Sequence, residues 1–380
     1  MTEIRFVSNE ELREAAALSD SVFRDAEQTS MGVAFPHIFA AGSSHSVGAF
    51  EAGKMVAFMG LVPKIIQVGR SQLQVHALGS VCTAPEFRGK GHASLMLDYV
   101  YTFIKQTGTS LLLVSGDRSL YTRSGCTTFG ALNHYIITAQ DVMNYRQDDE
   151  VKRINYRLFA AKDIFALHQL LKNSSVRYEG SIHDTAQLID SEAVASNHRL
   201  NHKVYVAELD GKVIASVIVA ASGRLTSDSE PFVVEWNGVA TVAVSLISYV
   251  MKELSIAQLH LCSPWHEDDL HKALEGTSFT RNQNSGTIKI IDAANFLEQL
   301  KPHLIEKNAD AASVINLVAS EDALAFDLSV LGNIIQISYD ELVALIFDPG
   351  ADISSLKPYK SILDTLFPIA FPYTAGLHYV

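Results

Sequence analysis

The sequence is poor in cysteine and has no long apolar run. Its three cysteines, Cys82, Cys126 and Cys262, are an odd number without close pairs, so neither a disulfide framework nor a zinc ribbon is expected. No stretch approaches the roughly 18 apolar residues of a membrane-spanning helix, and the first residues lack the basic and apolar segments of a secretion signal. These absences predict a cytoplasmic protein without a membrane partner.

Positive charge is also scarce. Lys and Arg number 30 against 42 Asp and Glu, a formal net charge of −12, which is the wrong sign for neutralising many nucleic-acid phosphates. Nucleic acid is therefore not expected as a partner. From Thr287 onward there are 12 acidic residues and 5 lysines, and no arginine follows Arg281. This acidic surplus either favours cationic ligands or only keeps the protein soluble, and the composition leaves both open.

The remaining composition is that of a folded protein with several domains. Hydrophobic residues make up 48% and charged residues 19% of the 380 residues, far from the polar composition of disordered chains. At roughly 100 to 200 residues per domain, this length predicts two or three domains.

The first part of the chain shows strand and helix patterns in alternation. A strand at 4–7 and a helix at 9–23 are followed by extended segments at 47–50, 55–62, 64–68 and 73–83, which predict antiparallel sheet. A helical apolar stripe at 93–106 then precedes the buried-strand run Leu111 to Val114. Strand, helix and strand in this order predict a parallel crossover.

A comparable order begins again after a polar linker at 144–152. Its predicted elements are a helix at 163–172, strands at 204–209, 213–220 and 232–236, a helix at 240–254, a strand at 258–262 and a helix from Pro264. From about Thr287, a helix, two strands and a capping-box spacing from Ser338 to Glu341 predict a small α+β domain. We therefore predict a mixed α+β chain with domains at 1–145, 146–286 and 287–380.

The most informative segment is Ala84 to Ala93, between a predicted strand and an amphipathic helix. A helix N-terminus offers unpaired backbone N–H groups to a diphosphate, and glycines at 89 and 91 leave room for its approach. Arg88 and Lys90 add positive charge. The spacing lacks both the ending of a nucleoside-triphosphate loop and the third glycine of a dinucleotide fingerprint. The alternative is a tight basic turn that only starts a helix.

This loop resembles the Arg/Gln-x-x-Gly-x-Gly/Ala signature of the GNAT acetyltransferases at Arg88, Gly91 and Ala93. The resemblance implies acetyl-coenzyme A (acetyl-CoA) as the co-substrate. It also implies that the pantetheine arm binds the backbone of the preceding strand. The cofactor-binding residues so implied are Val81, Thr83, Arg88, Gly89, Lys90, Gly91, His92 and Ala93.

Downstream, the segment Gly116 to Cys126 resembles the short helix of that family whose tyrosine protonates the departing thiolate. The residue in this position is Tyr121. A phenol with a pKa near 10 is protonated at neutral pH and can donate its proton to the sulfur as it becomes anionic. The alternative for Tyr121 is a tyrosine that only packs in the core.

The order of an intact GNAT unit, a second similar unit and a small α+β end domain resembles the Eis-like (enhanced intracellular survival) acetyltransferases over essentially the whole chain. The second unit lacks the loop signature at Trp236 to Thr241, so one acetyl-CoA site per chain is expected. The resemblance further implies tandem GNAT folds followed by a sterol-carrier-protein-like domain. It also implies a homo-oligomer, a hexamer, that acetylates amines including aminoglycosides, polyamines or lysine side chains.

In this family the C-terminal carboxylate acts as the general base, which is here the carboxylate of Val380. A free α-carboxyl group has a pKa of roughly 3.3 to 3.7, so it must be desolvated or act through water. His378, with an ordinary pKa nearer neutrality, is the alternative base. Asp25 and Glu27 follow the first helix, where the family opens its acceptor pocket. They either bind the cationic substrate or form a solvated acidic loop.

No covalent cysteine intermediate and no metal are expected. Cys82 and Cys126 are predicted to be small buried residues of a strand and a turn, and His198 with His202 is interpreted as the polar face of a helix without a third ligand. The sequence thus predicts an acetyl-CoA-dependent N-acetyltransferase that uses direct attack. The alternative is a non-catalytic scaffold that senses acetyl-CoA or binds lipid.

Overall fold

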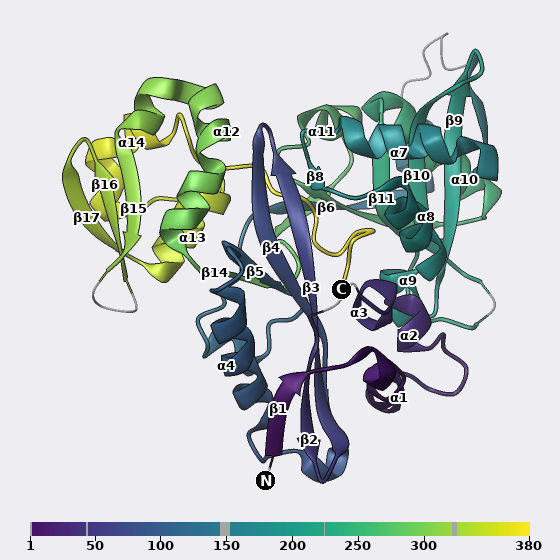
Figure 1. Cartoon of the computed structure of the whole chain (residues 1–380). Coiled ribbons are helices and arrows are strands. Elements are labelled where there is room, and N and C mark those ends of the chain that lie inside the picture. The colour runs from purple at the N-terminus through teal and green to yellow at the C-terminus, as the bar shows by residue number, and fades with distance from the viewer. Residues whose placement is uncertain (1, 43–44, 145–152, 224, 321–324) are drawn as a thin grey trace. The chain divides into compact units, whose positions relative to one another are not determined.

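The computed structural model describes residues 2–42, 45–144, 153–223, 225–320 and 325–380, which divide into two compact units (Figure 1). The first unit contains residues up to 131, residues 283–372 and Val380, and the second contains residues 132–282 and 373–379. The described part of the chain has no helix that is both long and apolar enough to cross a membrane.

The first unit is built on a sheet with the strand order β1-β2-β3-β4-β5-β14. Its strands are β1 (Thr2–Phe6), β2 (Val47–Glu51), β3 (Lys54–Val68), β4 (Ser71–Thr83), β5 (Leu111–Val114) and β14 (Thr287–Ile290). Neighbouring strands are antiparallel except β4 and β5, which are parallel. The predicted antiparallel sheet and parallel crossover are thus confirmed, although β14 was not foreseen. The segments predicted at 55–62 and 64–68 form one strand through Pro63, whose side chain is exposed.

Two helices cover opposite sides of this sheet (Figure 1). The helix α1 (Leu12–Phe23) follows a short helical turn, η1 (Asn9–Glu11), and contacts β3 and β4. The helix α4 (His92–Ile104) packs on β2, β3 and β4 through a stripe of buried residues, Met96, Leu97, Val100 and Ile104. This stripe repeats every three or four residues, as an amphipathic helix requires. Three shorter helices of the same unit are α2 (Met31–Ala34), α3 (Pro36–Phe39) and α5 (Ser119–Thr122).

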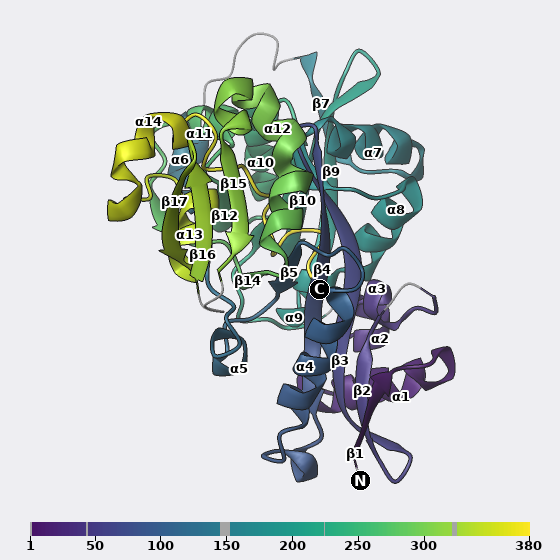
Figure 2. The same ribbon diagram turned by 60° about the vertical axis from the view of Figure 1, so that its left-hand side comes forward.

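The C-terminal segment of the first unit forms a small α+β layer (Figure 2). The helix α12 (Ala293–Ser313) precedes a three-stranded antiparallel sheet, β15 (Ile315–Ala319), β16 (Ala325–Val330) and β17 (Asn333–Ser338), and then α13 (Tyr339–Phe347), η5 (Ser354–Tyr359) and α14 (Lys360–Leu363). The predicted capping box is confirmed, because the Ser338 hydroxyl accepts the Glu341 N–H and the Glu341 carboxylate accepts the Ser338 N–H.

This layer is tied to the first sheet through α12. The Ser71 hydroxyl donates to the Leu300 carbonyl at 2.9 Å and accepts the His303 N–H at 3.0 Å. The Gln299 side-chain oxygen accepts the Gln74 N–H at 2.9 Å. Because β14 and α12 both join the first sheet, residues 283–372 belong to one compact unit with residues 1–131. The three-domain division at 145 and 286 stays a prediction about how the chain is organised.

The second unit contains a seven-stranded sheet with the order β13-β6-β12-β11-β10-β9-β7. Its strands are β6 (Leu132–Thr138), β7 (Asn155–Leu158), β9 (Asn201–Leu209), β10 (Lys212–Ala221), β11 (Phe232–Gly238), β12 (Gln258–Pro264) and β13 (Phe279–Asn282), with β8 (Val176–Tyr178) as a further short strand. Its helices are α6 (Ala139–Asn144), α7 (Ile164–Asn173), with a short helical turn η4 (Ala161–Asp163) before it, α8 (Ile182–Ser191), α9 (Ala193–Asn197), α10 (Ala240–Glu253) and α11 (Asp268–Ala273).

The second unit repeats the strand pattern of the first. An antiparallel run, β9, β10 and β11, is followed by α10 and by β12, which is parallel to β11. The chain therefore has two mixed α+β units with a strand, helix, strand crossover in each, as predicted. The helix expected from Pro264 begins instead at Asp268, because Ser263 and Pro264 continue β12 beside β6. The predicted linker lies, apart from Asn144, outside the described residues.

Candidate active site

The loop between β4 and α4 has the backbone of an anion cradle. Gly89 (φ +78°) and Gly91 (φ +82°) both adopt left-handed conformations, and Gly91 caps the first turn of α4. A Cβ added to either glycine would meet no atom within 4 Å. Glycine is therefore needed here for backbone conformation and open access rather than for packing. This arrangement fits a diphosphate at the positive end of a helix of 13 residues.

The charged side chains of this loop divide into two sets. Arg88 and Lys90 are exposed; the Arg88 Nε donates to the Thr83 carbonyl at 3.3 Å, and the Lys90 Nζ lies 4.4 Å from the centre of the Phe87 ring. His92 is buried, with its Nε2 3.2 Å from a carboxylate oxygen of Glu51. Of the predicted cofactor residues, His92 can therefore offer a ligand only its backbone N–H.

Glu51 was missed by sequence reasoning. It ends β2, and its second carboxylate oxygen lies 3.8 Å from the Lys90 Nζ. The Glu51 carboxylate thus lies beside both Lys90 and His92. Because β2 and the loop are about 40 residues apart in the sequence, only the sheet pairing brings them together.

The strands β4 and β5 stop pairing next to this loop. Their register runs from Val75 and Leu111 to Leu78 and Val114, and β4 continues to Thr83 without β5 beside it. The side chain of Val81 packs against the core under α4, so the backbone is what Val81 can offer to a ligand. Beyond Leu78, β4 has the open edge that a pantetheine arm requires.

Tyr121 lies in α5, directly after β5 and within the core of the first unit. Its side chain is only 6% exposed and packs with Leu78, Val114 and Cys126. Burial raises the pKa of Tyr121 to about 12, with the Arg118 charge acting in the opposite direction. The phenol is thus firmly protonated at neutral pH. The raised pKa keeps the proton on the phenol until negative charge develops on the departing sulfur, to which the hydroxyl can then donate.

The C-terminal residue lies at the point where β4 and β5 separate. Val380 is buried, and a Cβ placed on Gly79 would overlap its terminal carboxylate. The same Cβ position is 3.3 Å from the Ser115 hydroxyl, which itself donates to the Leu78 carbonyl. The predicted base therefore sits on the strand that carries Val81 and Thr83.

The other candidate base, His378, is described within the second unit. Its ring stacks on Tyr178 with a centroid distance of 4.7 Å and an interplanar angle of 24°. The neighbouring Leu377 is buried in the core of that unit, and its N–H points to the Glu235 carboxylate at 3.4 Å. The tail segment before Val380 is thus held by aromatic stacking, apolar burial and a hydrogen bond to Glu235.

Asp25 and Glu27 form part of a turn after α1. The Asp25 carboxylate accepts the N–H groups of Glu27 and Gln28 at 3.0 and 3.1 Å, and both acidic residues are exposed. Asp25 thus has a structural task in shaping the turn. A substrate-binding role of these two residues stays a prediction.

Both cysteines near the loop have protonated thiols. Burial raises the pKa of Cys82 to about 11 and also raises that of Cys126. The Cys82 thiol contacts the Ser19 hydroxyl at 3.6 Å, and the Cys126 thiol contacts the Tyr101 hydroxyl at 3.6 Å. Because a thiolate is the reactive form, neither residue has the environment of a nucleophile.

Within the described ranges, no group of three or more His, Cys, Asp or Glu side chains is arranged to hold a metal ion. The helical interpretation of the two histidines was wrong: α9 ends at Asn197, before His198, and His202 lies in β9 because its backbone pairs with Ala220.

The corresponding loop of the second unit is closed by protein backbone. Gly238 ends β11 just before α10, and a Cβ there would overlap the carbonyl of Ile214 and lie 2.8 Å from the Cα of Ala215. This glycine allows β11 to approach β10, whereas Gly89 and Gly91 face open space. Among the described residues, the loop before α10 thus lacks the open glycine-lined backbone that Gly89 and Gly91 give to the loop before α4.

The first part of the chain matches a known protein family. Residues 3–129 match the acetyltransferase (GNAT) domain family, so this part of the chain, including the loop and Tyr121, is a GNAT domain. GNAT enzymes in general use acetyl-CoA as the acyl donor. No curated protein matches the sequence.

Solved structures extend the likeness to the whole chain. The Eis protein from Mycobacterium abscessus aligns over 100% of both chains with a TM-score of 0.65 and 12% identity. GCN5-related N-acetyltransferases from Kribbella flavida and Anabaena variabilis also align over 100% of both chains, with TM-scores of 0.64 and 0.63 and identities of 15% and 13%. Residues 3–129 therefore form a GNAT acetyltransferase domain, and the chain as a whole is similar in fold to the Eis protein.

Proposed function

We propose that this protein transfers an acetyl group from acetyl-CoA to a primary amine by direct attack, with one active site in the first unit. The observation that carries the proposal is the Val380 carboxylate against Gly79, on the open edge of β4. The same unit holds the Gly89 to Gly91 cradle and the buried Tyr121. The proposed base, the proposed coenzyme-binding loop and the acid proposed to protonate the departing sulfur therefore belong to one compact unit.

The proposed reaction uses these groups as follows. The Val380 carboxylate accepts the proton of the amine, whose nitrogen forms a bond to the thioester carbonyl carbon. The carbon–sulfur bond breaks, and the Tyr121 hydroxyl donates to the departing sulfur, which leaves as the free thiol. The proton on Val380 returns to solvent, and Tyr121 is reprotonated. Burial of Val380 strengthens its interaction with an ammonium group, because a low dielectric weakens competition from water.

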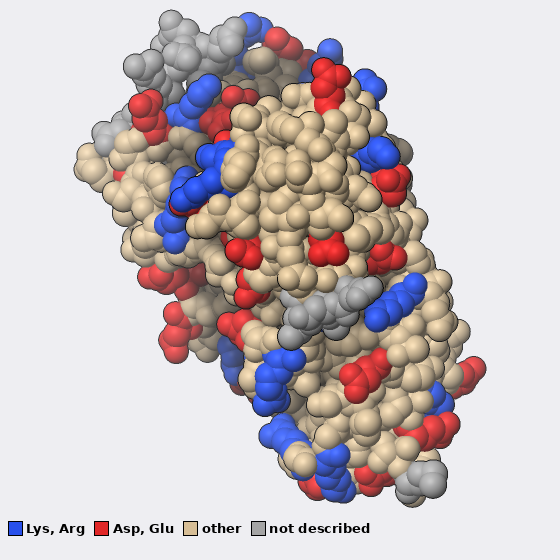
Figure 3. Space-filling model, turned by 90° about the vertical axis from the view of Figure 1, so that its left-hand side faces the viewer, with Lys and Arg blue, Asp and Glu red and all other residues tan. Residues whose placement is uncertain are grey.

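The acceptor is proposed to be cationic. The net charge of −12 favours cationic substrates, and the exposed Asp25 and Glu27 on the turn after α1 are proposed to contact a second positive group. On the face drawn in Figure 3, basic side chains stand in small groups with acidic side chains between them. A small-molecule polyamine, an aminoglycoside-like compound and a lysine side chain all have the required chemistry.

Assembly and location follow from the family resemblance. We propose a homo-oligomer, a hexamer, that works in the cytoplasm, with residues from about 287 forming a sterol-carrier-protein-like end domain. Size-exclusion chromatography with light scattering measures the mass directly against the 41.6 kDa chain.

The test begins with calorimetric titration of acetyl-CoA and an assay of free-thiol release against polyamines, aminoglycosides and lysine peptides. One binding site per chain with amine-dependent thiol release is expected. Deleting Tyr379 and Val380 should abolish transfer while leaving the melting temperature nearly unchanged, because the tail before them stays docked through Leu377. Full activity in this truncation would remove the carboxylate mechanism.

A second variant separates the two candidate bases. His378→Ala removes the ring that stacks on Tyr178 but leaves the terminal carboxylate. We expect a small loss of activity with an unchanged pH profile. Loss of the acidic limb of the pH profile would assign the base to His378 instead.

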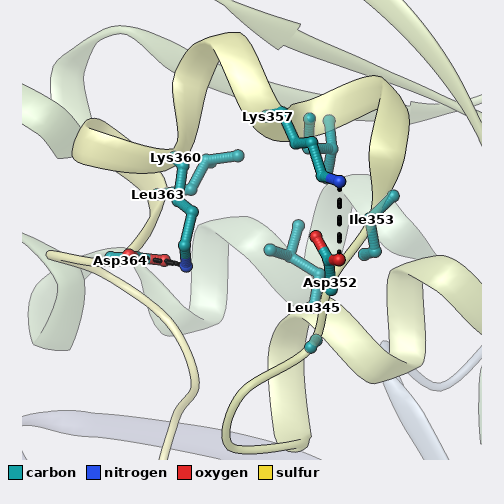
Figure 4. Close-up of a pocket in the computed structure, with 9 residues that line it drawn as sticks. Leu345, Asp352, Ile353, Lys357, Lys360, Leu363 and Asp364 are labelled. Atoms are coloured by element: carbon teal, nitrogen blue, oxygen red, sulfur yellow. Dashed lines mark hydrogen bonds and ion pairs between the residues drawn. The ribbon is translucent and has the colours of Figure 1, made fainter.

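The alternative function is a scaffold that senses acetyl-CoA or binds lipid. The feature of the structure that bears on it is an open hollow near α13 and α14 (Figure 4). Its wall combines apolar Leu345, Ile353 and Leu363 with the ion pairs Lys357–Asp352 and Lys360–Asp364. The cavity volume of about 30 Å³ is far below the roughly 300–1,000 Å³ of small-molecule sites, so the hollow in this conformation does not enclose a lipid. Coenzyme binding without thiol release on any amine, together with fatty-acid binding, would favour this function.

A further inference from the structure

Ser80 has an unusual backbone conformation on the strand that is proposed to bind the coenzyme. Its φ is +50°, the left-handed region that costs a residue with a Cβ roughly 1–2 kcal/mol. Glycine is the residue that normally occupies such a position. Retention of serine in a strained conformation is a reason to look for a function of its side chain.

The strain arises from a bulge in β4. Phe58 pairs with Cys82 and Gly60 pairs with Gly79, so Ser80 and Val81 together oppose the single residue Met59. Leu78 and Val81 both pack into the core under α4, which would be impossible in a regular strand, where residues three apart face opposite sides. The bulge therefore places two residues, Gly79 and Ser80, between the core-facing Leu78 and Val81, where a regular strand would have one.

The side that Gly79 faces is occupied by the reactive end of the chain. The Val380 carboxylate lies directly over Gly79, one residue from Ser80 and beyond the last pair of β4 with β5, Leu78 and Val114. Ser80 is thus at the open edge where the proposed function requires the thioester to lie.

The Ser80 hydroxyl is buried and has no hydrogen-bond partner among the described residues. A buried hydroxyl without a partner is costly and requires an explanation. The nearby Ser115 hydroxyl, by contrast, donates to the Leu78 carbonyl at 3.3 Å. Of the two hydroxyls at this edge, only that of Ser80 is left for a ligand.

We propose that the Ser80 hydroxyl donates a hydrogen bond to the carbonyl oxygen of the thioester, a role that rests on the proposed acetyl transfer. As the amine nitrogen bonds to the carbonyl carbon, negative charge develops on this oxygen. When the carbon–sulfur bond breaks, the electron pair on the oxygen re-forms the carbonyl double bond of the new amide. Ser80 keeps its proton throughout. A preorganised donor aimed at developing charge is among the strongest sources of catalysis.

The first test is Ser80→Ala. Removing the donor should lower kcat roughly 10- to 100-fold, with the KM for the amine changed by less than about threefold, because the lost interaction forms mainly in the transition state. Calorimetry provides a readout without any acceptor. Binding of acetyl-CoA should weaken roughly threefold or more, while binding of free coenzyme A, which has no acetyl carbonyl, should not change.

Ser80→Gly and a matched residue separate the hydroxyl from the strain. Ser80→Gly removes both, so it should melt one to a few degrees higher yet lose as much activity as Ser80→Ala. Ser255 has the same residue type at φ +54°, is exposed, and follows α10 in the second unit. Ser255→Gly should gain similar thermal stability and keep full activity.

Three results would overturn the assignment. Wild-type kcat in Ser80→Ala would show that the hydroxyl takes no part. A rise confined to the KM for the amine would show that Ser80 contacts the acceptor instead of the thioester. Equally weaker binding of acetyl-CoA and of free coenzyme A in Ser80→Ala would show that the substitution acts by changing the structure and not by removing a hydrogen bond to the acetyl carbonyl. If the unmodified protein binds acetyl-CoA but acetylates no amine, the proposed function fails, whereas the calorimetric comparison still tests Ser80.

Discussion

The terminal carboxylate of Val380 lies against the α-carbon of Gly79, so that no side chain fits at this position of β4. The two residues are 301 positions apart, yet both belong to the first unit. The φ of Gly79 is not positive, so its backbone conformation does not by itself require glycine. Its lack of a side chain therefore serves the chain terminus.

Gly79→Ala is expected to displace the terminal carboxylate and lower kcat by at least roughly tenfold, because misplacing a reacting group by about 1 Å has large effects. Coenzyme affinity should be kept. Gly180→Ala is a matched control, because its added Cβ would meet only ordinary contacts of 3.5 Å or more. In a chain that already lacks Val380, Gly79→Ala should have no further effect on the residual rate, and an equal loss there would contradict the relationship.

Tyr121→Phe should lower kcat roughly 100-fold or more, the usual size of a lost general acid. The phenyl ring still fills the core, so the melting temperature and the dissociation constant for acetyl-CoA should stay nearly unchanged. Tyr101→Phe removes a hydroxyl of the same core, one that contacts Cys126, and should retain activity. Steady-state kinetics and calorimetry measure both, and normal turnover in Tyr121→Phe would remove Tyr121 from the mechanism.

Gly91→Ala should weaken acetyl-CoA binding by roughly tenfold or more. The added Cβ strains the left-handed backbone that caps α4 and stands in the approach of the diphosphate. Gly350→Ala is the control, since Gly350 also has φ +82° with no atom within 4 Å of an added Cβ. Both variants should lose similar stability, about 1 kcal/mol. Equal affinity of the two for the coenzyme would argue against the cradle.

The stability of the first unit should fall in mild acid because of His76. This histidine is 3% exposed and is bonded to Thr109 and His45. Burial lowers the pKa of His76 to about 4, with a smaller contribution from His45. Since the ordinary value is 6.5, between pH 6.5 and 4 the unfolded chain binds more protons than the folded one, and stability decreases as the pH falls.

Denaturant unfolding across this range measures the effect, which amounts to at most about 3 kcal/mol. His76→Gln should flatten the dependence between pH 6.5 and 4, whatever its stability at neutral pH. The exposed His183 provides the control, since His183→Gln should leave the slope unchanged. An unaltered slope in His76→Gln would assign the acid sensitivity to other groups.

Local patterns in the sequence predicted much of the fold. The apolar stripe of α4, the buried run of β5 and the Ser338 capping box each depend on residues a few positions apart. By contrast, β14 was missed, because a strand of only four residues is defined by its pairing with β5 and not by its own pattern. The start of α11 was misplaced for the same reason, since pairing with β6 extends β12 through Pro264.

The candidate site divides in the same way. The sequence by itself determined the loop from Arg88 to Ala93, because a glycine-containing turn at a helix N-terminus is a local property of backbone conformation. Only the tertiary structure decided that Glu51 lies beside this loop, that Ser80 is strained with an unpartnered hydroxyl, and that Val380 lies on Gly79. These relationships join residues distant in the chain, and their burial and pairing exist only once the sheet has formed.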